Sequence, residues 1–390
     1  MQIIIYLTAY FLVVSSLAND IIDESIDMDK NTQEMAEIHG YPCENYTAVT
    51  LDGYILRLFR IPGHRNESLE EAKKHKRQPV ILQHGLVDSS DMFLVNEEPA
   101  LGYLLADAGF DVWIPNLRGN KYSKMHQTLK VTSEEFWNFS IDEVIKYDIK
   151  AIFTRVIEIT KFDQVFYAGH SMGGGTFIAA ASRDPKFYGR YAKGYVGLAP
   201  STRSLHSLYL LRLAFYTKFF TTFQRLGMHE IFNFDKNVRN FFSYFCDCFP
   251  DICSQILSLL ADQQPEYDNT KKYKVFFNHY PSGTSTHQII HIMQQSAHYG
   301  YYEYQRSPID PLIEYDFTKF PPEVPVAIYA GAADLLVSVI DTRWLRDKLK
   351  PLNVVKEYKE YIGYGHLTFI LPGKYYDPYY DTLAFFKRYK

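Results

Sequence analysis

Short apolar segments alternate with longer amphipathic segments along most of the chain from Pro79 onward. Residues 164–168 form an apolar run too short for a helix, whereas the apolar residues of 140–160 recur at helical spacing. The same two patterns predict strands at 79–85, 110–116, 164–168, 194–200, 324–331 and 354–361, and helices at 98–109, 140–160, 176–181, around Trp344 and at 379–389. Strands that alternate with helices predict a parallel sheet covered by helices on both faces.

The amino-terminal part of the chain follows other patterns. Residues 1–18 are apolar and uncharged and end in small side chains, which predicts a cleaved secretory signal peptide rather than a membrane anchor. The next stretch is polar and acidic, and we expect residues 19–37 to be a flexible leader. Residues 46–61 then alternate apolar and polar side chains around Asp52-Gly53, which predicts a β-hairpin.

Residues 201–320 interrupt the alternation of strands and helices. The apolar and aromatic stretch at 204–223 includes an arginine and a lysine, and two cations within one span argue against a transmembrane helix. We therefore expect 201–320 to be a helical cap and lid insertion, which lies over a core formed by 38–200 and 321–390.

The composition is that of an ordinary globular protein, apart from its aromatic content. Of the 390 residues, 47% are hydrophobic and 22% charged, and the net charge of −4 gives no basic surface for nucleic acid. The aromatic fraction of 16% agrees equally with an aromatic core and with an apolar binding site. In a secretory protein, Asn45, Asn66 and Asn138 become candidate glycosylation sites, and the aromatic residues that flank Asn138 argue for its burial.

Three of the four cysteines cluster in the sequence CDCFPDIC, whereas Cys43 stands alone. In an oxidising compartment such a cluster favours a local disulfide. We expect Cys246 to pair with Cys253. Cys246 and Cys248 are only two residues apart, which is too close for an easy bridge. Metal binding is the alternative, but no histidine lies at ligand spacing beside the cluster.

The sequence YAGHSMGGG, at 167–175, places a serine where an expected strand meets an expected helix. It fits the G-x-S-x-G pattern of a nucleophile elbow, in which small flanking residues leave room for a strained serine backbone. Five residues alone are a weak signal, because a glycine-rich turn with an idle serine has the same sequence. The strand–turn–helix context favours a nucleophile at Ser171.

A serine hydroxyl needs a base to become a nucleophile, and the base needs a carboxylate that orients it. After a nucleophile elbow, the acid precedes the histidine along the chain. Asp334 lies on the loop after the strand at 324–331, and His366 lies on a glycine-flanked loop after the strand at 354–361. Taken alone, each position fits an ordinary loop residue as well as a catalytic one. Their order and setting together predict Asp334 as the orienting acid and His366 as the general base.

The oxyanion of an acyl-transfer intermediate needs N–H donors as well. Met172 follows the serine directly and offers one backbone N–H. The loop at 82–93 offers a second, for which we expect Leu86. We expect His84 in that loop to be structural, and His170 to point away from the serine hydroxyl.

These stretches resemble the acid lipases of the α/β-hydrolase fold, a family that includes gastric lipase and lysosomal acid lipase. The matching stretches are LQHGLVDSSDMF, AGFDVWIPNLRGNKYS, FWNFSIDEVIKYDIKA, GHSMGGGTF, NHYPSGTST, AGAADLL and YGHLTFI, in family order from about residue 36 to the end. The resemblance implies the triad Ser171, Asp334 and His366, with Leu86 and Met172 in the oxyanion hole. It also implies a helical cap near 201–310 and hydrolysis of triacylglycerols or sterol esters without a metal or organic cofactor.

The chain departs from the family pattern at a few positions. Met172 stands where glutamine is common, Ala333 where an asparagine commonly precedes the acid, and Thr368 where aspartate is often found. We expect these changes to shift the rate or the pH profile before they change the mechanism. The cap matches least well, and its cysteine spacing is shorter than usual.

The sequence thus predicts a secreted or lysosomal lipase that cleaves lipid esters through an acyl-enzyme and touches a membrane or lipid-droplet surface transiently. One alternative is a soluble carboxylesterase or acyltransferase on the same fold, which a comparison of emulsified with dissolved ester would separate. The other is a non-catalytic lipid-binding protein, which would not react with a fluorophosphonate.

Overall fold

The computed structural model describes residues 26–96, 100–207, 213–214 and 217–390, so the signal peptide expected at 1–18 lies outside the described residues. Within these ranges, nine strands form one central sheet with the order β1-β2-β4-β3-β6-β7-β10-β11, and β5 pairs with β2. The strands are β1 Glu44–Val49, β2 Tyr54–Ile61, β3 Gln78–Gln83, β4 Phe110–Pro115, β5 Met125–His126, β6 Val165–His170, β7 Ala192–Leu198, β10 Val326–Gly331 and β11 Val355–Tyr361.

The sheet is antiparallel at one edge and parallel over the rest. Strands β1 and β2 form the hairpin predicted around Asp52-Gly53, with Val49 opposite Ile55, and β2 also runs antiparallel to β4. From β4 through β3, β6, β7 and β10 to β11, every neighbouring pair is parallel. These pairings confirm the predicted parallel sheet. Parallel pairing is possible here because the chain returns between the strands through crossovers that contain helices.

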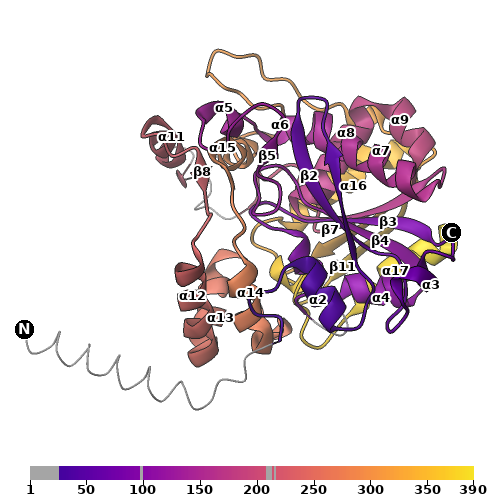
Figure 1. Ribbon diagram of the computed structural model, residues 1–390. Coiled ribbons are helices and arrows are strands. Elements are labelled where there is room, and N and C mark those ends of the chain that lie inside the picture. The colour runs from indigo at the N-terminus through magenta and orange to yellow at the C-terminus, as the bar shows by residue number, and fades with distance from the viewer. Residues whose placement is uncertain (1–25, 97–99, 208–212, 215–216) are drawn as a thin grey trace, which may run out of the picture.

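Helices cover both faces of the sheet (Figure 1). Phe166 of β6 points into the cluster that contains Phe386 of α17, whereas its neighbour Tyr167 points into the opposite cluster with Phe153 of α7 and Phe177 of α8. This alternation follows from the two-residue period of a strand. The helices around the sheet are α2 Thr32–Ile38, α3 Leu69–Ala72, α4 Leu101–Asp107, α5 Glu134–Trp137, α6 Ile141–Glu143, α7 Ile149–Thr160, α8 Met172–Arg183, α9 Pro185–Tyr191, α16 Val339–Leu349 and α17 Asp377–Tyr389. A π-helical turn, Val144–Asp148, links α6 to α7 within the helix predicted at 140–160.

The expectation of a flexible leader over 19–37 is wrong for its last part. Helix α2 begins at Thr32, and the Asn31 side chain accepts hydrogen bonds from the backbone N–H groups of Gln33 and Glu34. Met35 is fully buried against the core. The capping signal at Asn31 and the apolar face of this short helix were hidden in a segment whose composition is polar.

The regular structure between β7 and β10 consists mainly of helices where the structure describes it, and this segment lies beside the sheet core (Figure 1). Its helices are α11 Phe219–Arg225, α12 Lys236–Cys248, α13 Pro250–Leu260, α14 Tyr273–His279 and α15 Thr286–Gln295, and the strands β8 Glu230–Ile231 and β9 Thr284–Ser285 form a small antiparallel pair. Part of the apolar stretch at 204–223 lies outside the described residues. In the described ranges, no helix has the length and apolar character needed to cross a membrane.

A disulfide between Cys246 and Cys253 joins α12 to α13, as predicted. Both cysteines are buried at the contact between these two helices. Cys248 is exposed and Cys43 is buried, and both are free thiols.

All three candidate glycosylation sites, Asn45, Asn66 and Asn138, are exposed. The expected burial of Asn138 is therefore wrong. Its neighbours Trp137 and Phe139 are buried, but the short helix α5 ends before Asn138 and directs its side chain outward, where its Oδ1 accepts a hydrogen bond from Arg306.

Candidate active site

The predicted nucleophile elbow lies at the carboxyl end of β6, near the middle of the sheet. Strand β6 ends at His170 and helix α8 begins at Met172, so Ser171 forms the whole turn between them. Its backbone has φ 53° and ψ −125°, a region that side-chain-bearing residues rarely occupy. This strained turn presents the serine side chain at the edge of the sheet instead of burying it among the strands.

The small residues around Ser171 are required by close backbone contacts. A Cβ on Gly173 would collide with the carbonyl oxygen of His84 on the neighbouring strand end, and a Cβ on Gly175 would overlap the carbonyl oxygen of Ser201. A Cβ on Gly169 would lie 2.6 Å from the backbone of Gly173. Strand β6 and helix α8 can therefore make this tight corner only without side chains at these positions.

Gly175→Ala is expected to lower the free energy of unfolding by about 3 kcal/mol, because the Ser201 carbonyl it would meet belongs to the backbone and has little room to move. Urea denaturation followed by circular dichroism measures this change. Gly189→Ala in α9 is the matched control, because it also lies in a helix but faces the flexible end of Glu323. Equal stabilities for the two variants would contradict the packing account.

The structure brings Ser171, His366 and Asp334 together from positions far apart in the chain. His366 Nε2 lies 2.8 Å from Ser171 Oγ, and His366 Nδ1 lies 2.8 Å from Asp334 Oδ2. Asp334 follows β10 and His366 follows β11, so parallel strands deliver both loops to the same edge of the sheet as the elbow. All three side chains are buried.

The hydrogen bonds of Asp334 determine which ring nitrogen of His366 carries the hydrogen. Its Oδ1 accepts from the backbone N–H groups of Leu336 at 2.8 Å and Val337 at 2.7 Å, which leaves Oδ2 for the histidine. A carboxylate can only accept, so His366 Nδ1 carries the hydrogen and Nε2 presents a lone pair to Ser171. The Ser171 hydroxyl then donates to Nε2, which is the arrangement required for a serine nucleophile with a histidine base.

Leu86 and Met172 flank Ser171 from two directions. Met172 is the first residue of α8, so its N–H has no acceptor within the helix. Gly85, directly before Leu86, passes so close to Ser171 that a Cβ there would lie 2.9 Å from the serine Cβ. Both predicted donor residues thus adjoin the reacting side chain.

A cavity of about 140 Å³ opens at Ser171 and His366. Most of its wall is apolar, and segments from both the sheet core and the region between β7 and β10 contribute to it. The side chains in this wall include Leu86, Val87, Tyr280, Ile292, Leu336, Val337, Leu367 and Ile370. Such a cavity suits an acyl chain better than a charged ligand.

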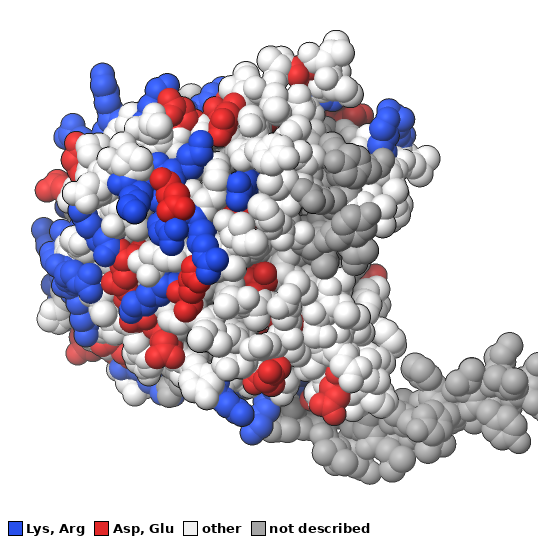
Figure 2. Space-filling view, turned by 180° about the vertical axis from the view of Figure 1, so that it is seen from behind, with Lys and Arg blue, Asp and Glu red and all other residues white. Residues whose placement is uncertain are grey.

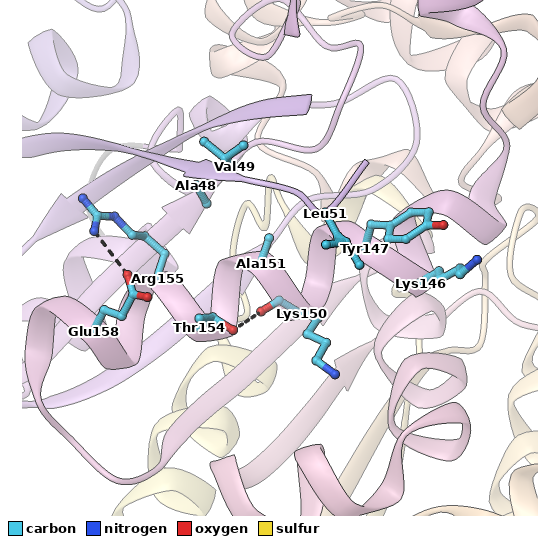
Figure 3. Close-up of a pocket in the computed structure, with 10 residues that line it drawn as sticks. All are labelled: Ala48, Val49, Leu51, Lys146, Tyr147, Lys150, Ala151, Thr154, Arg155 and Glu158. Carbon is cyan, nitrogen blue, oxygen red and sulfur yellow. Dashed lines mark hydrogen bonds and ion pairs between the residues drawn. The ribbon is translucent and has the colours of Figure 1, made fainter. Parts of the chain in front are cut away.

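A larger hollow of about 450 Å³ lies elsewhere, between the β1–β2 hairpin and α7 (Figure 3). Its lining combines Val49 and Leu51 with Lys146, Lys150 and Arg155. Neither a serine nor a histidine lines it, so its size does not make it a candidate site for ester chemistry. Among the described residues, no cluster of three or more His, Cys, Asp or Glu side chains is placed to hold a metal ion.

Two further histidines support the site. His84 is buried, its Nδ1 donates to the Gly85 carbonyl at 2.8 Å, and its Nε2 accepts from the Leu117 N–H at 3.0 Å, which confirms the predicted structural role. Burial lowers the pKa of His84 to about 4. His170 Nε2 donates to the carbonyl of His366 at 3.1 Å, and burial holds its pKa well below the usual range. The sequence did not reveal this link, because the two residues are 196 positions apart.

Comparison with known proteins identifies the family of this chain. Residues 32–97 match a model described as a partial α/β-hydrolase lipase region, and residues 78–372 match the α/β hydrolase fold. Lipase member J from Homo sapiens is 34% identical, with 90% of this chain and 98% of that protein covered. Lipase lipl-5 from Caenorhabditis elegans is 33% identical, with 94% and 93% covered, and gastric triacylglycerol lipase from Rattus norvegicus is 32% identical, with 88% of each covered.

Solved structures agree with the fold. One from Acinetobacter baumannii has a TM-score of 0.50 and 14% sequence identity, with 92% of this chain and 94% of that chain covered. The family match spans most of the chain, including the elbow and both loops that meet it. The chain therefore belongs to the acid lipases of the α/β-hydrolase fold, and it is a carboxylic ester hydrolase.

Proposed function

We propose that this protein is a lipase in which Ser171, His366 and Asp334 form the catalytic triad. The observation that carries the proposal is the continuous chain of hydrogen bonds from Ser171 Oγ through His366 to Asp334, each 2.8 Å long. The relatives' names include gastric triacylglycerol lipase, which supports triacylglycerols as substrates.

The reaction follows from the proton positions. Ser171 Oγ attacks the ester carbonyl carbon while His366 Nε2 takes the hydroxyl proton, and the N–H groups of Leu86 and Met172 stabilise the oxyanion. His366 then donates that proton to the leaving alcohol oxygen, and the ester C–O bond breaks to give an acyl-enzyme on Ser171. Water attacks the acyl carbon with the same histidine as base, and fatty acid leaves.

We propose that residues 201–320 form a cap whose outer surface meets the lipid. Large apolar side chains are exposed along α11, α12 and α13, in contrast to the buried core. They include Phe219, Phe241, Phe242, Phe249, Ile252, Ile256, Leu259 and Leu260. In the view of Figure 2, the side of the molecule that carries these helices is mostly uncharged, whereas charged side chains crowd the opposite side. Exposed apolar side chains in this number fit a lipid interface.

Two substitutions on α13 test the contact with lipid. Ile256 and Leu259 are 47% and 69% exposed, and replacing both by glutamine is expected to lower fatty-acid release from emulsified trioleoylglycerol by about 10-fold, because apolar burial at the interface is lost. Hydrolysis of dissolved p-nitrophenyl butyrate by this variant should stay unchanged. Leu51→Gln is the control, because Leu51 is 92% exposed but lies on the hairpin of the core.

The same assay separates the alternatives. A lipase releases more fatty acid once a triacylglycerol exceeds its solubility and forms droplets. A rate that saturates below the solubility limit would favour a soluble esterase, and transfer of the acyl group to an added alcohol in preference to water would favour an acyltransferase. A protein that binds droplets without releasing fatty acid would be the non-catalytic alternative.

We propose a site of action outside the cytosol, either extracellular or lysosomal. The apolar segment at 1–18 has the pattern of a secretory signal, and the Cys246–Cys253 disulfide requires an oxidising compartment during folding. Three exposed sequons agree with passage through the secretory pathway.

A further inference from the structure

Two buried carboxyl groups, Asp262 and Asp268, lie directly behind the loop that carries His366. Asp262 is fully buried and Asp268 is 5% exposed. They flank a short stretch between α13 and α14, which includes the 3-10 turn η3 Pro265–Tyr267. Neither residue touches Ser171, and the catalytic steps above do not use them.

Asp262 holds the backbone on one side of the histidine. Its Oδ1 and Oδ2 accept from the Leu367 N–H at 3.0 and 3.1 Å. Gly365, on the other side of His366, packs so closely on the Asp262 carboxyl that any Cβ would overlap it. The aspartate therefore fixes the backbone immediately before and after the catalytic histidine.

Asp268 holds the same loop through a hydroxyl group. Its Oδ1 accepts a hydrogen bond from Thr368 Oγ1 at 2.6 Å. The Thr368 Oγ1 atom in turn accepts a hydrogen bond from the Gly365 N–H at 3.1 Å. The Tyr273 hydroxyl donates to Asp268 Oδ2 at 3.3 Å. The loop of His366 is thus hydrogen-bonded to Asp262 and Asp268 at two successive residues, Leu367 and Thr368.

The same stretch also braces the loop of the catalytic acid. The Gln263 N–H donates to the Ala333 carbonyl at 2.9 Å, and the Leu335 N–H donates to the Ala261 carbonyl at 2.9 Å. These two bonds enclose Asp334. A displacement of this stretch would therefore disturb both partners of Ser171.

Burial makes ionisation of the pair unfavourable. Desolvation, with the nearby Asp268 and Asp334 carboxylates, raises the pKa of Asp262 well above its usual range. Desolvation also raises the pKa of Asp268 to about 7, against the opposing hydrogen bond from Thr368. The titratable and charged groups on the surrounding elements are Asp334, His366, Tyr364, Tyr267, Glu266, Tyr273, Lys271, Lys272 and Lys374.

We propose that Asp262 and Asp268 are positioning residues whose protonated pair clamps the His366 loop against Ser171, and that the clamp weakens as the pair loses protons. This inference rests on the proposed function, because it concerns the same triad. A charged carboxylate would have to stay buried beside Asp334 in the clamped loop, whereas opening the loop would hydrate it.

The sign of the pH dependence follows from these pKa values. In the unfolded chain the two carboxyls lose their protons near pH 4. In the folded protein the pKa of Asp268 is raised to about 7, and that of Asp262 is raised as well. The folded state therefore binds more protons between these pH values, and the free energy of unfolding falls as the pH rises across this interval.

The experiment compares wild type, Asp268→Asn and Asp262→Asn/Asp268→Asn between pH 4 and 9. Asparagine keeps an acceptor oxygen for Thr368 and Leu367 but cannot ionise. For p-nitrophenyl butyrate, the ratio of kcat at pH 8 to kcat at pH 5 should be about 10-fold higher in the variants, because the wild-type carboxyl is about nine-tenths ionised at pH 8. KM should stay unchanged. A pH profile that matches wild type, or an equal loss of kcat at every pH, would overturn the proposal.

A second pair of variants tests the hydroxyl link independently. Thr368→Val removes the bond to Asp268 and the acceptor for the Gly365 N–H, and is expected to lower kcat by about 10-fold with little change in KM. Thr368→Ser should restore kcat. If valine and serine have the same kcat, the link does not position His366.

Thermal unfolding separates this inference from the proposed function, because it needs no substrate. The midpoint of the wild type should fall more steeply between pH 4 and 7 than that of Asp262→Asn/Asp268→Asn, whereas the exposed control Asp163→Asn should follow wild type. Wild type without ester hydrolysis would overturn the proposed function alone. Equal slopes for wild type and the double variant would overturn the clamp even if the enzyme is active.

Discussion

Replacing Ser171 by alanine is expected to lower kcat for ester hydrolysis by about 10⁵-fold, because no acyl-enzyme can form without the hydroxyl oxygen. The residual rate would come from the oxyanion donors and the binding cavity. The backbone of residue 171 has positive φ in the folded protein, and alanine meets the same backbone restriction as serine. We therefore expect the variant to fold and to unfold at nearly the same temperature as wild type.

Initial rates with p-nitrophenyl butyrate and with emulsified trioleoylglycerol measure this loss, and thermal unfolding checks the fold. Ser201→Ala is a suitable control, because Ser201 also lines the cavity but its hydroxyl is given no part in the reaction. A Ser171→Ala variant that keeps a tenth of the wild-type kcat would mean that another group is the nucleophile.

Asp334→Asn is expected to lower kcat by about 10⁴-fold, although the site keeps its shape. The amide oxygen can still accept from the Leu336 and Val337 N–H groups, so the amide nitrogen takes the position of Oδ2. This nitrogen donates, and His366 Nδ1 must then accept. The histidine hydrogen moves to Nε2, where it faces Ser171 and cannot take the hydroxyl proton.

The control for this substitution is Asp316→Asn, which removes a carboxylate at an exposed helix cap and should leave kcat unchanged. The effects of Ser171→Ala and Asp334→Asn on kcat should not be additive, because both residues act within the same triad. The double variant Ser171→Ala/Asp334→Asn should therefore hydrolyse ester at about the rate of Ser171→Ala. A further 10⁴-fold loss in the double variant would show that Asp334 acts separately from the serine.

Much of the sheet was predictable because its signals are local. The buried strands and the hairpin at Asp52-Gly53 lie within a few residues of where the patterns place them. The order of Ser171, Asp334 and His366 was predictable as well, since each follows a strand of one parallel sheet. The structure adds the distances that join the three side chains, which no sequence pattern contains.

Contacts between distant segments were not predictable. The bond from His170 to the His366 carbonyl depends on loops 196 positions apart. The clamp of Asp262 and Asp268 comes from a part of the chain without periodic signal, and its partners Leu367 and Thr368 lie about 100 positions further on. The burial expected for Asn138 was wrong because this residue lies just beyond the end of α5, where its side chain faces solvent although both neighbours are buried.

The most direct test of Ser171 as the nucleophile is to identify the acylated residue. Wild type is mixed briefly with p-nitrophenyl butyrate, quenched in acid and digested, and the masses of the peptides are measured by mass spectrometry. A catalytic Ser171 should carry the butyryl group on its own peptide, and Ser171→Ala should give no adduct. Stable turnover with the butyryl group on a different residue, or with none on Ser171 under conditions where p-nitrophenol is released in a burst, would contradict it.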